Sequence, residues 1–490
     1  MSGFTNPVIP GFHPDPSVCR VGEEYFLVAS SFTYFPGVPI FRSSNLVDWT
    51  QIGNVLDRPS QLDLADTDTF SSGGVFAPTL RHRDGRFWMI TTTLGARGLF
   101  MFFVTAEDPA GPWTDPVFVP LVGIDPDLAW DDEGNCWVHY SAAGIRRCRI
   151  DDRRGEVLEG PDPTWSGTGS AHPEAPHLYE RDGVWYLLIA EGGTERGHAV
   201  SIARGPAPIG PWESCPSNPI LSHRSTDRPI QNTGHADIVD APDGSSWAVL
   251  LGVRPAGITP QFHVLGRETF LTAVEWVDGW PRVAPVELDM DRRPPGAGDA
   301  TTSSKRYEFD EPALGPEWLA LRRPPTAFTS LEPPTGLLID GASSSLDDPE
   351  ASYVGIRQQH PRCRARTEVV TAHDGDAGLA VIMDNTAHYD VAVVGTTIVA
   401  RLRLDTIRST LGEAPRPDGP VVLRIETDDH PSGPDTVRLG FEVGDEFHQL
   451  AELDGRYLST EVQGGFIGRT IGVFATGCIA EFAWFEYDGR

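Results

Sequence analysis

Three carboxylates lie in short proline-containing segments, and their side chains are suited to acid–base chemistry. Asp15 is held between two prolines, and proline fixes its own φ and restricts the residue before it. That stiffness suits a general base that must hold one water molecule in line. Glu174 reaches one methylene further than an aspartate, which suits proton donation to a leaving oxygen. A third acid, Asp125, lies in a similar segment and could orient the proton donor and tune its pKa. Asp127, two residues further on, is the alternative residue for this role.

A weak internal repeat places these acids at equivalent positions. Its core is a turn containing Asp and Gly followed by an aromatic-led strand, at 84–88, 132–137, 182–186 and 243–247. Such a turn between apolar runs is a hairpin signal, because glycine readily adopts a positive φ. A Pro- or acid-marked segment precedes each turn, and these segments recur about every 50 to 60 residues. The pattern predicts an all-β fold with a five-bladed β-propeller over residues 1–285.

The propeller prediction brings the three acids together. The innermost strand of each blade lines a central channel, so Asp15, Asp125 and Glu174 should meet on one axis. Like charges at one place raise a carboxyl pKa, so one acid should stay protonated. A protonated acid beside an ionised base is what glycoside hydrolysis requires. An inverting enzyme separates the two by roughly 6.5–9.5 Å to admit water, a gap that separate blades can provide.

The sequence changes character after the fifth repeat. Residues 286–306 are rich in Pro, Arg, Ser and Thr, which predicts a linker. Residues 307–490 contain short alternating runs such as 378–383 and 436–441. About 180 residues of this kind predict a C-terminal β-sandwich.

Charge and composition exclude several classes of function. The 39 Lys and Arg against 69 Asp and Glu give a net charge of −30, which argues against nucleic acid or an anionic membrane as partner. The sequence contains no run of about 18 apolar residues, so no membrane span is expected. No secretory signal is visible in the first residues, so a cytoplasmic location is expected. Lys305 is the only lysine, and the arginine bias indicates a bacterial source.

Six further motifs occur in order along the first part of the chain: HPDPS (13–17), YFPGV (34–38), EAPHLY (174–179), AEGGT (190–194), TGHAD (233–237) and GRET (266–269). Together they resemble glycoside hydrolase family 43, in particular its β-xylosidases and α-L-arabinofuranosidases. The resemblance implies a five-bladed propeller followed by a concanavalin-like β-sandwich. It also implies inversion at the non-reducing end of a short oligosaccharide, with Asp15 as general base, Glu174 as general acid and Asp125 as the residue that tunes the pKa of the acid.

The resemblance further implies a set of sugar-binding residues. They are Phe32, Phe76, His235, Arg267 and Phe466, the last on a loop of the sandwich. Phe76 occupies a position where many relatives carry Trp or Tyr. No cofactor is expected to be required, although a calcium or other divalent ion on the propeller axis, near His235, is compatible with the resemblance.

We therefore expect an exo-acting glycosidase that releases terminal β-D-xylose from xylo-oligosaccharides, with α-L-arabinofuranose as a further substrate. A mainly α-L-arabinofuranosidase activity is the first alternative. A non-catalytic carbohydrate-binding protein is the second. Relatives are often oligomers, so a homo-oligomer is compatible with the resemblance.

Overall fold

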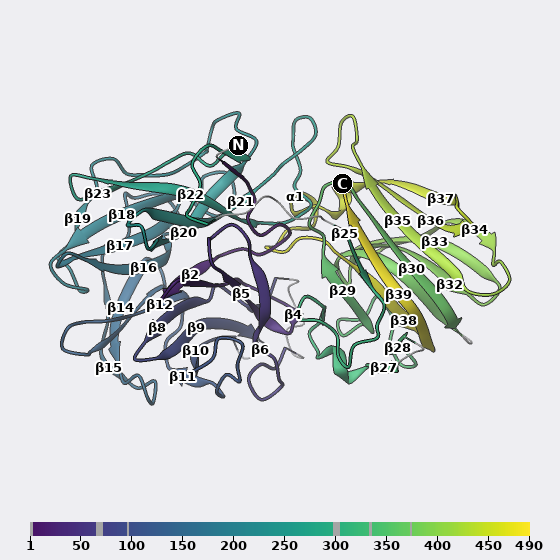
Figure 1. The fold of residues 1–490 in the computed structure, drawn as a ribbon, viewed down its shortest axis with the longest axis horizontal. Coiled ribbons are helices and arrows are strands. Elements are labelled where there is room, and N and C mark those ends of the chain that lie inside the picture. Colours follow the sequence, from purple (N-terminus) through teal and green to yellow (C-terminus); the bar gives the residue numbers. More distant parts are fainter. Residues whose placement is uncertain (1–2, 65–71, 96–97, 297–303, 333–335, 373–374) are drawn as a thin grey trace.

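A computed structural model describes residues 3–64, 72–95, 98–296, 304–332, 336–372 and 375–490. It consists of two β-rich halves lying side by side, an N-terminal propeller and a C-terminal sandwich (Figure 1). The all-β prediction is confirmed. None of the helices in the described part of the chain has the length and apolar character of a membrane span.

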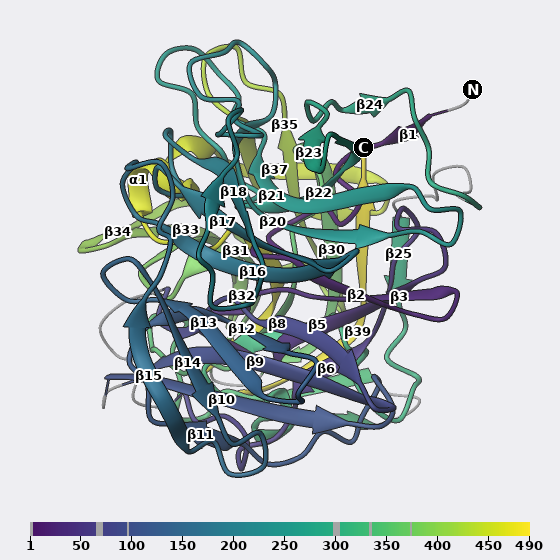
Figure 2. The same ribbon diagram turned by 90° about the vertical axis from the view of Figure 1, so that its left-hand side faces the viewer.

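Five antiparallel sheets form the blades of the propeller, which faces the viewer in Figure 2. The first three blades comprise β2 (Ser17–Val21), β3 (Glu24–Val28), β5 (Gly37–Ser43) and β6 (Thr50–Leu56); β7 (Gly74–Val75), β8 (Thr79–Arg83), β9 (Arg86–Gly95), β10 (Gly98–Ala106) and β11 (Val117–Val119); β12 (Ile124–Trp130), β13 (Cys136–Ser141), β14 (Ile145–Ile150) and β15 (Val157–Pro163). The last two comprise β16 (Glu174–Arg181), β17 (Val184–Glu191), β18 (Ala199–Gly205) and β19 (Glu213–Ser214); β20 (Gln231–Asp240), β21 (Ser246–Val253), β22 (Glu268–Val277) and β23 (Trp280–Val283).

The innermost strands close into a ring. β2 contacts β8 and β20, β12 contacts β8 and β16, and β16 contacts β20. These strands come from five different blades, so the ring confirms the five-bladed propeller predicted from the repeat.

The Asp-Gly turns act as hairpin connections in two of the blades. Asp84 and Gly85 join β8 to β9 with φ values of 51° and 72°, and Asp182 and Gly183 join β16 to β17 with 53° and 77°. Two consecutive positive φ angles match the right-handed twist of the flanking strands. The corresponding connections in blades 3 and 5 are five residues long, 131–135 and 241–245, so the repeat conserves the hairpin but varies its turn.

The C-terminal half consists of two eight-stranded sheets. The first contains β25 (Ser304–Tyr307), β27 (Thr329–Glu332), β28 (Gly336–Asp340), β30 (Cys363–Ala372), β35 (Val421–Asp428), β36 (Thr436–Val443), β37 (Glu446–Asp454) and β39 (Ile479–Gly489). The second contains β4 (Tyr34–Phe35), β26 (Leu319–Leu321), β29 (Tyr353–Arg357), β31 (Asp376–Asp384), β32 (Ala387–Val394), β33 (Thr397–Leu404), β34 (Ile407–Pro415) and β38 (Thr470–Thr476). Short helical turns lie at η1 (Pro325–Ala327), η2 (Gly455–Leu458) and α1 (Thr460–Gln463).

The two halves share a sheet and a core. β4 precedes most of the propeller in sequence, yet it pairs with β26 at the edge of the second sandwich sheet. Phe12, Phe32 and Tyr34 of the propeller are buried in the same apolar cluster as the sandwich core. Within 286–306, β24 (Asp289–Met290) pairs with β1 (Phe4–Thr5).

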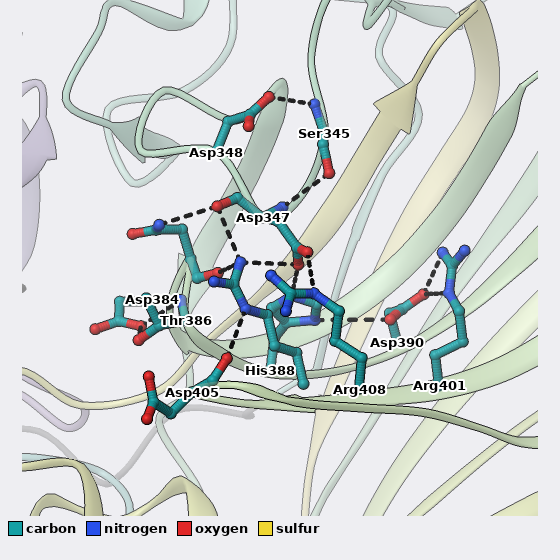
Figure 3. A network of polar contacts seen from close by, with 12 residues as sticks. Ser345, Asp347, Asp348, Asp384, Thr386, His388, Asp390, Arg401, Asp405 and Arg408 are labelled. Atoms are coloured by element: carbon teal, nitrogen blue, oxygen red, sulfur yellow. Dashed lines mark hydrogen bonds and ion pairs between the residues drawn. The ribbon is translucent and has the colours of Figure 1, made fainter.

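The sandwich also holds a network of ion pairs beside a cavity of about 310 Å³ (Figure 3). Asp347 accepts hydrogen bonds from His388 Nε2 at 3.1 Å and from Arg408 Nε at 2.7 Å. Asp390 accepts from Arg401 Nε at 2.9 Å and Nη2 at 2.6 Å. Since these charges pair with one another, the network ties β32, β33 and β34 to the 345–348 turn.

Candidate active site

Unusual backbone conformations turn the predicted site residues toward the propeller axis. Asp15, Asp125 and His235 have φ values of 57°, 53° and 48°, and Ala175, directly after Glu174, has 52°. Non-glycine residues rarely adopt this region, and such strain clusters at functional sites. Register irregularities follow at the start of β12, β16 and β20. These bulges break the alternation of the strand and re-aim its first side chains.

Asp15 is buried and surrounded by groups that favour its ionised form. Arg267 Nη1 donates to Asp15 Oδ1 at 2.9 Å, and Ser30 Oγ donates to Oδ2 at 2.5 Å. His235 Nδ1 lies 3.4 Å from Oδ1. Burial by itself raises the pKa of Asp15, but Arg267, then His235 and Ser30, outweigh it and hold that pKa below its ordinary value. Asp15 is therefore a carboxylate at neutral pH.

The pKa values of Glu174 and Asp125 are shifted in the opposite direction, upward. Burial, followed by the negative charge of Asp15, raises the pKa of Glu174 to about 7, while Arg267 opposes the rise. Burial, then the charges of Glu174 and Asp15, raise the pKa of Asp125 well above its ordinary value. The backbone N–H of Ala175 donates to Asp125 Oδ2 at 3.2 Å, so the second carboxyl lies directly beside the strand that carries Glu174. The site thus combines one ionised carboxylate with a pair that retains a proton.

Asp127, the alternative to Asp125, faces a different partner. Its Oδ1 lies 2.9 Å from Arg81 Nη2, and its Oδ2 accepts the backbone N–H of Leu178 at 2.7 Å. The simple alternation of a strand would place 125 and 127 on one face, but the bulge between Ile124 and Asp127 separates them. Asp125, whose pKa the charge of Glu174 raises, therefore lies beside the proposed acid, whereas Asp127 pairs with Arg81.

Aromatic side chains from both halves of the molecule gather beside Arg267. The ring of Phe32 lies 5.6 Å from Phe76 and 5.8 Å from Phe466, measured between centroids. The Arg267 guanidinium lies 5.7 Å from the Phe32 centroid and 5.2 Å from that of Phe466. Phe32 is fully buried, whereas Phe76 and Phe466 are partly exposed. The latter two are thus the rings available to a ligand, and Phe32 supports them.

His235 is the residue expected near a divalent ion. It is buried, and burial lowers its pKa to about 3, so its imidazole is neutral. Its ring centroid lies 6.1 Å from that of His177. Among the residues that the structure describes, no group of three or more His, Cys, Asp or Glu side chains is arranged to hold a metal ion. An ion beside His235 would therefore take most of its ligands from water, and its presence stays a prediction.

Several contacts of the site were not predicted from the sequence. Ser30 contacts the proposed base, and Thr194 Oγ1 accepts a hydrogen bond from Arg267 Nη1 at 3.1 Å. Thr194 ends the AEGGT motif, and Ser30 lies two residues before the predicted Phe32, so nearness to a predicted residue was the available signal. Arg81 and His198 were not predicted either: the assembled ring brings Arg81 to Asp127 and Asp237, and the pairing of strands within the fourth blade brings His198 to Glu174.

The ring of inner strands and the split protonation of its carboxylates define a glycoside hydrolase type of site, and comparison with known proteins assigns the family. Residues 4–281 match the family model of glycosyl hydrolases family 43, and residues 306–488 match that of the β-xylosidase C-terminal concanavalin A-like domain. The chain belongs to glycoside hydrolase family 43.

Individual relatives span nearly the whole chain. A non-reducing end α-L-arabinofuranosidase of Bacteroides ovatus is 36% identical over 99% of this chain and 94% of its own length. A xylosidase/arabinosidase of Butyrivibrio fibrisolvens is 36% identical over 96% of this chain and 95% of its own. The crystal structure of a xylan β-1,4-xylosidase from Bacillus halodurans superposes with a TM-score of 0.90 at 30% identity, covering 99% of this chain and all of that one.

Proposed function

We propose that this glycoside hydrolase releases terminal β-D-xylose from xylo-oligosaccharides with inversion at the anomeric carbon. The observation that carries the proposal is the divergence of two carboxyl pKa values. Arg267 holds the pKa of Asp15 low, while burial raises the pKa of Glu174 to about 7. One group is then ready to accept a proton and the other to donate one at neutral pH.

The proposed reaction uses water as its only co-substrate. Asp15 removes a proton from a water molecule as the water oxygen bonds to the anomeric carbon. The bond from that carbon to the leaving oxygen breaks, and Glu174 gives its proton to that oxygen. Asp125 keeps the proton on Glu174 before reaction, Arg267 binds the sugar, and Phe76 and Phe466 pack beside it. Proton exchange with solvent then restores the starting state.

The α-L-arabinofuranosidase alternative has specific support. Two relatives that span nearly the whole chain carry arabinofuranosidase or arabinosidase in their names. Phe76 stands in place of a larger aromatic residue and is one of the two rings available to a ligand. It therefore bears on the choice between xylose and arabinofuranose as the terminal sugar. The cytoplasmic location, a bound divalent ion and self-association stay predictions.

Comparing kcat/KM on an aryl β-D-xyloside and on the matching aryl α-L-arabinofuranoside tests the proposal. We expect the xyloside to be the better substrate and the Asp15→Ala and Glu174→Ala variants to lose most activity toward xylobiose. A higher value for the arabinofuranoside would establish the alternative. If the native chain binds both sugars but hydrolyses neither, or if the two substitutions change nothing, the carboxylate mechanism is wrong.

A further inference from the structure

A buried histidine that the proposed mechanism leaves unused lies next to the proposed acid. His198, directly before β18, is 1% exposed, and its Nε2 lies 3.8 Å from Glu174 Oε1. Gly234 on β20 makes room for the imidazole, because a Cβ at this position would overlap the ring. The ring is therefore fixed in place by the neighbouring blade.

The hydrogen bonding of the ring fixes its tautomer. His198 Nδ1 lies 2.9 Å from the backbone oxygen of Asn232, and a carbonyl oxygen can only accept a hydrogen bond, so Nδ1 carries the hydrogen. Burial, assisted by the charge of Arg267, lowers the pKa of His198 to about 4. The imidazole is thus neutral at neutral pH, and Nε2 bears a lone pair.

That lone pair has no hydrogen-bond partner within the described residues, although the atom is buried. An unpaired buried acceptor is costly, and such groups in a native structure call for an explanation. The carboxyl of Glu174, when it is protonated, would supply a hydrogen-bond donor for this lone pair. A movement of about 1 Å would bring its O–H within hydrogen-bond range of Nε2.

We propose that His198 is a positioning residue for the general acid, whose bare Nε2 accepts the hydrogen bond of the protonated Glu174 carboxyl in the free enzyme. The inference rests on the proposed function, which assigns the acid role to Glu174. The proton stays on Oε1 until substrate binds. Rotation about the Cγ–Cδ bond of Glu174 then turns the same O–H from the imidazole to the leaving oxygen. One hydrogen bond is exchanged for another, and no covalent bond forms or breaks in this step.

The lone pair on His198 Nε2 affects the protonation of Glu174. Nε2 can stabilise only the protonated carboxyl and repels the ionised one, so His198 favours the acid form. Asp15, Asp125 and Arg267 also act on Glu174, and Asp15, Arg267 and His235 act on His198. A test must therefore change the acceptor and leave these groups in place.

A matched pair of substitutions does this. In His198→Asn the side-chain amide can keep the donor at the Nδ1 position but lacks an acceptor at the Nε2 position. In His198→Gln the amide oxygen can occupy the Nε2 position. We expect the alkaline limb of the kcat/KM profile on xylobiose, which reports the free enzyme, to move about one pH unit lower in His198→Asn and to stay near its native position in His198→Gln.

A second substrate shows whether the variants keep an intact site. A dinitrophenyl β-xyloside has a leaving group that needs no proton, so His198→Asn should lose far less rate on it than on xylobiose above neutral pH. Equal losses on both substrates, an unmoved alkaline limb in His198→Asn, or the same movement in both variants would overturn the proposal. These outcomes differ from failure of the proposed function, in which the native enzyme itself would not hydrolyse xylobiose.

Discussion

At the scale of single residues, burial and one arginine give three neighbouring carboxyls different charges. Arg267 contacts Asp15 directly and keeps it ionised, whereas burial and neighbouring negative charges raise the pKa values of Glu174 and Asp125. Because the latter two interact strongly, their protons leave in two steps that belong to the pair. In the proposed mechanism the active form holds one proton on Glu174, and we expect the alkaline limb of the rate to report the loss of this proton.

The Asp125→Asn substitution tests the shared proton. Without the second carboxyl, ionising Glu174 no longer places two negative charges side by side, so its proton should leave at lower pH. We expect the alkaline limb of kcat/KM on xylobiose to move down by about one pH unit or more, with the acidic limb little changed. Asp127→Asn is a poor control, since it would break the Arg81 pair. An alkaline limb that stays in place in Asp125→Asn would reject the tuning role.

Sequence reasoning reached these acids because local chemistry and the repeat marked them. Asp15 and Glu174 lie in proline-containing segments at corresponding points of the blades. Arg81 carries no comparable mark, since Asp127 and Asp237 lie on other blades and reach it only when the ring closes. His198 also lacks such a mark, and it reaches Glu174 only when the strands of the fourth blade pair. Which of Asp125 and Asp127 faces Glu174 depends on a bulge, which alternation along a strand does not predict.

At the scale of secondary structure, the inner strands are joined by an ionic cluster made of Arg81, Asp127, His177 and Asp237. Arg81 on β8 lies 2.9 Å from Asp127 on β12, 3.0 Å from Asp237 on β20 and 3.0 Å from His177 Nδ1 on β16. Ser17 on β2 donates to Asp237 at 2.8 Å. Asp127 and Asp237 are fully buried. β12 and β16, which carry Asp125 and Glu174, are thus tied to β20 through Arg81, and β2, which begins two residues after Asp15, joins them through Ser17.

Replacing Arg81 by Met should destabilise the propeller strongly. The change leaves two buried carboxylates without their cation, which typically costs about 3–5 kcal/mol of unfolding free energy. Arg42→Met removes a surface pair with Glu24, whose side chains are 56% and 40% exposed, and should cost at most about 1 kcal/mol. Urea unfolding of the two variants measures the difference. Equal losses would show that the Arg81 cluster does not hold the ring together.

At the scale of the whole molecule, the sandwich is part of the site. Phe466, on the loop between α1 and β38, contacts both Phe32 and Arg267, and its backbone N–H donates to Ser72 Oγ at 2.6 Å. β4 crosses in the other direction and joins the sandwich sheet. The sequence indicated two β-rich halves from changes in composition, and the motif resemblance suggested Phe466. The shared sheet was not predicted, because a two-residue strand such as β4 carries no periodic pattern.

In the proposed mechanism, Asp15 and Glu174 act from different blades on opposite sides of one sugar. Proton NMR of xylobiose during the first moments of hydrolysis tests it most directly, because it reports the released sugar and its anomeric form together. We expect α-xylose to appear first from the β-linked end and to equilibrate with the β-anomer later. If β-xylose forms first, the configuration is retained, and a water molecule activated by Asp15 is not the nucleophile.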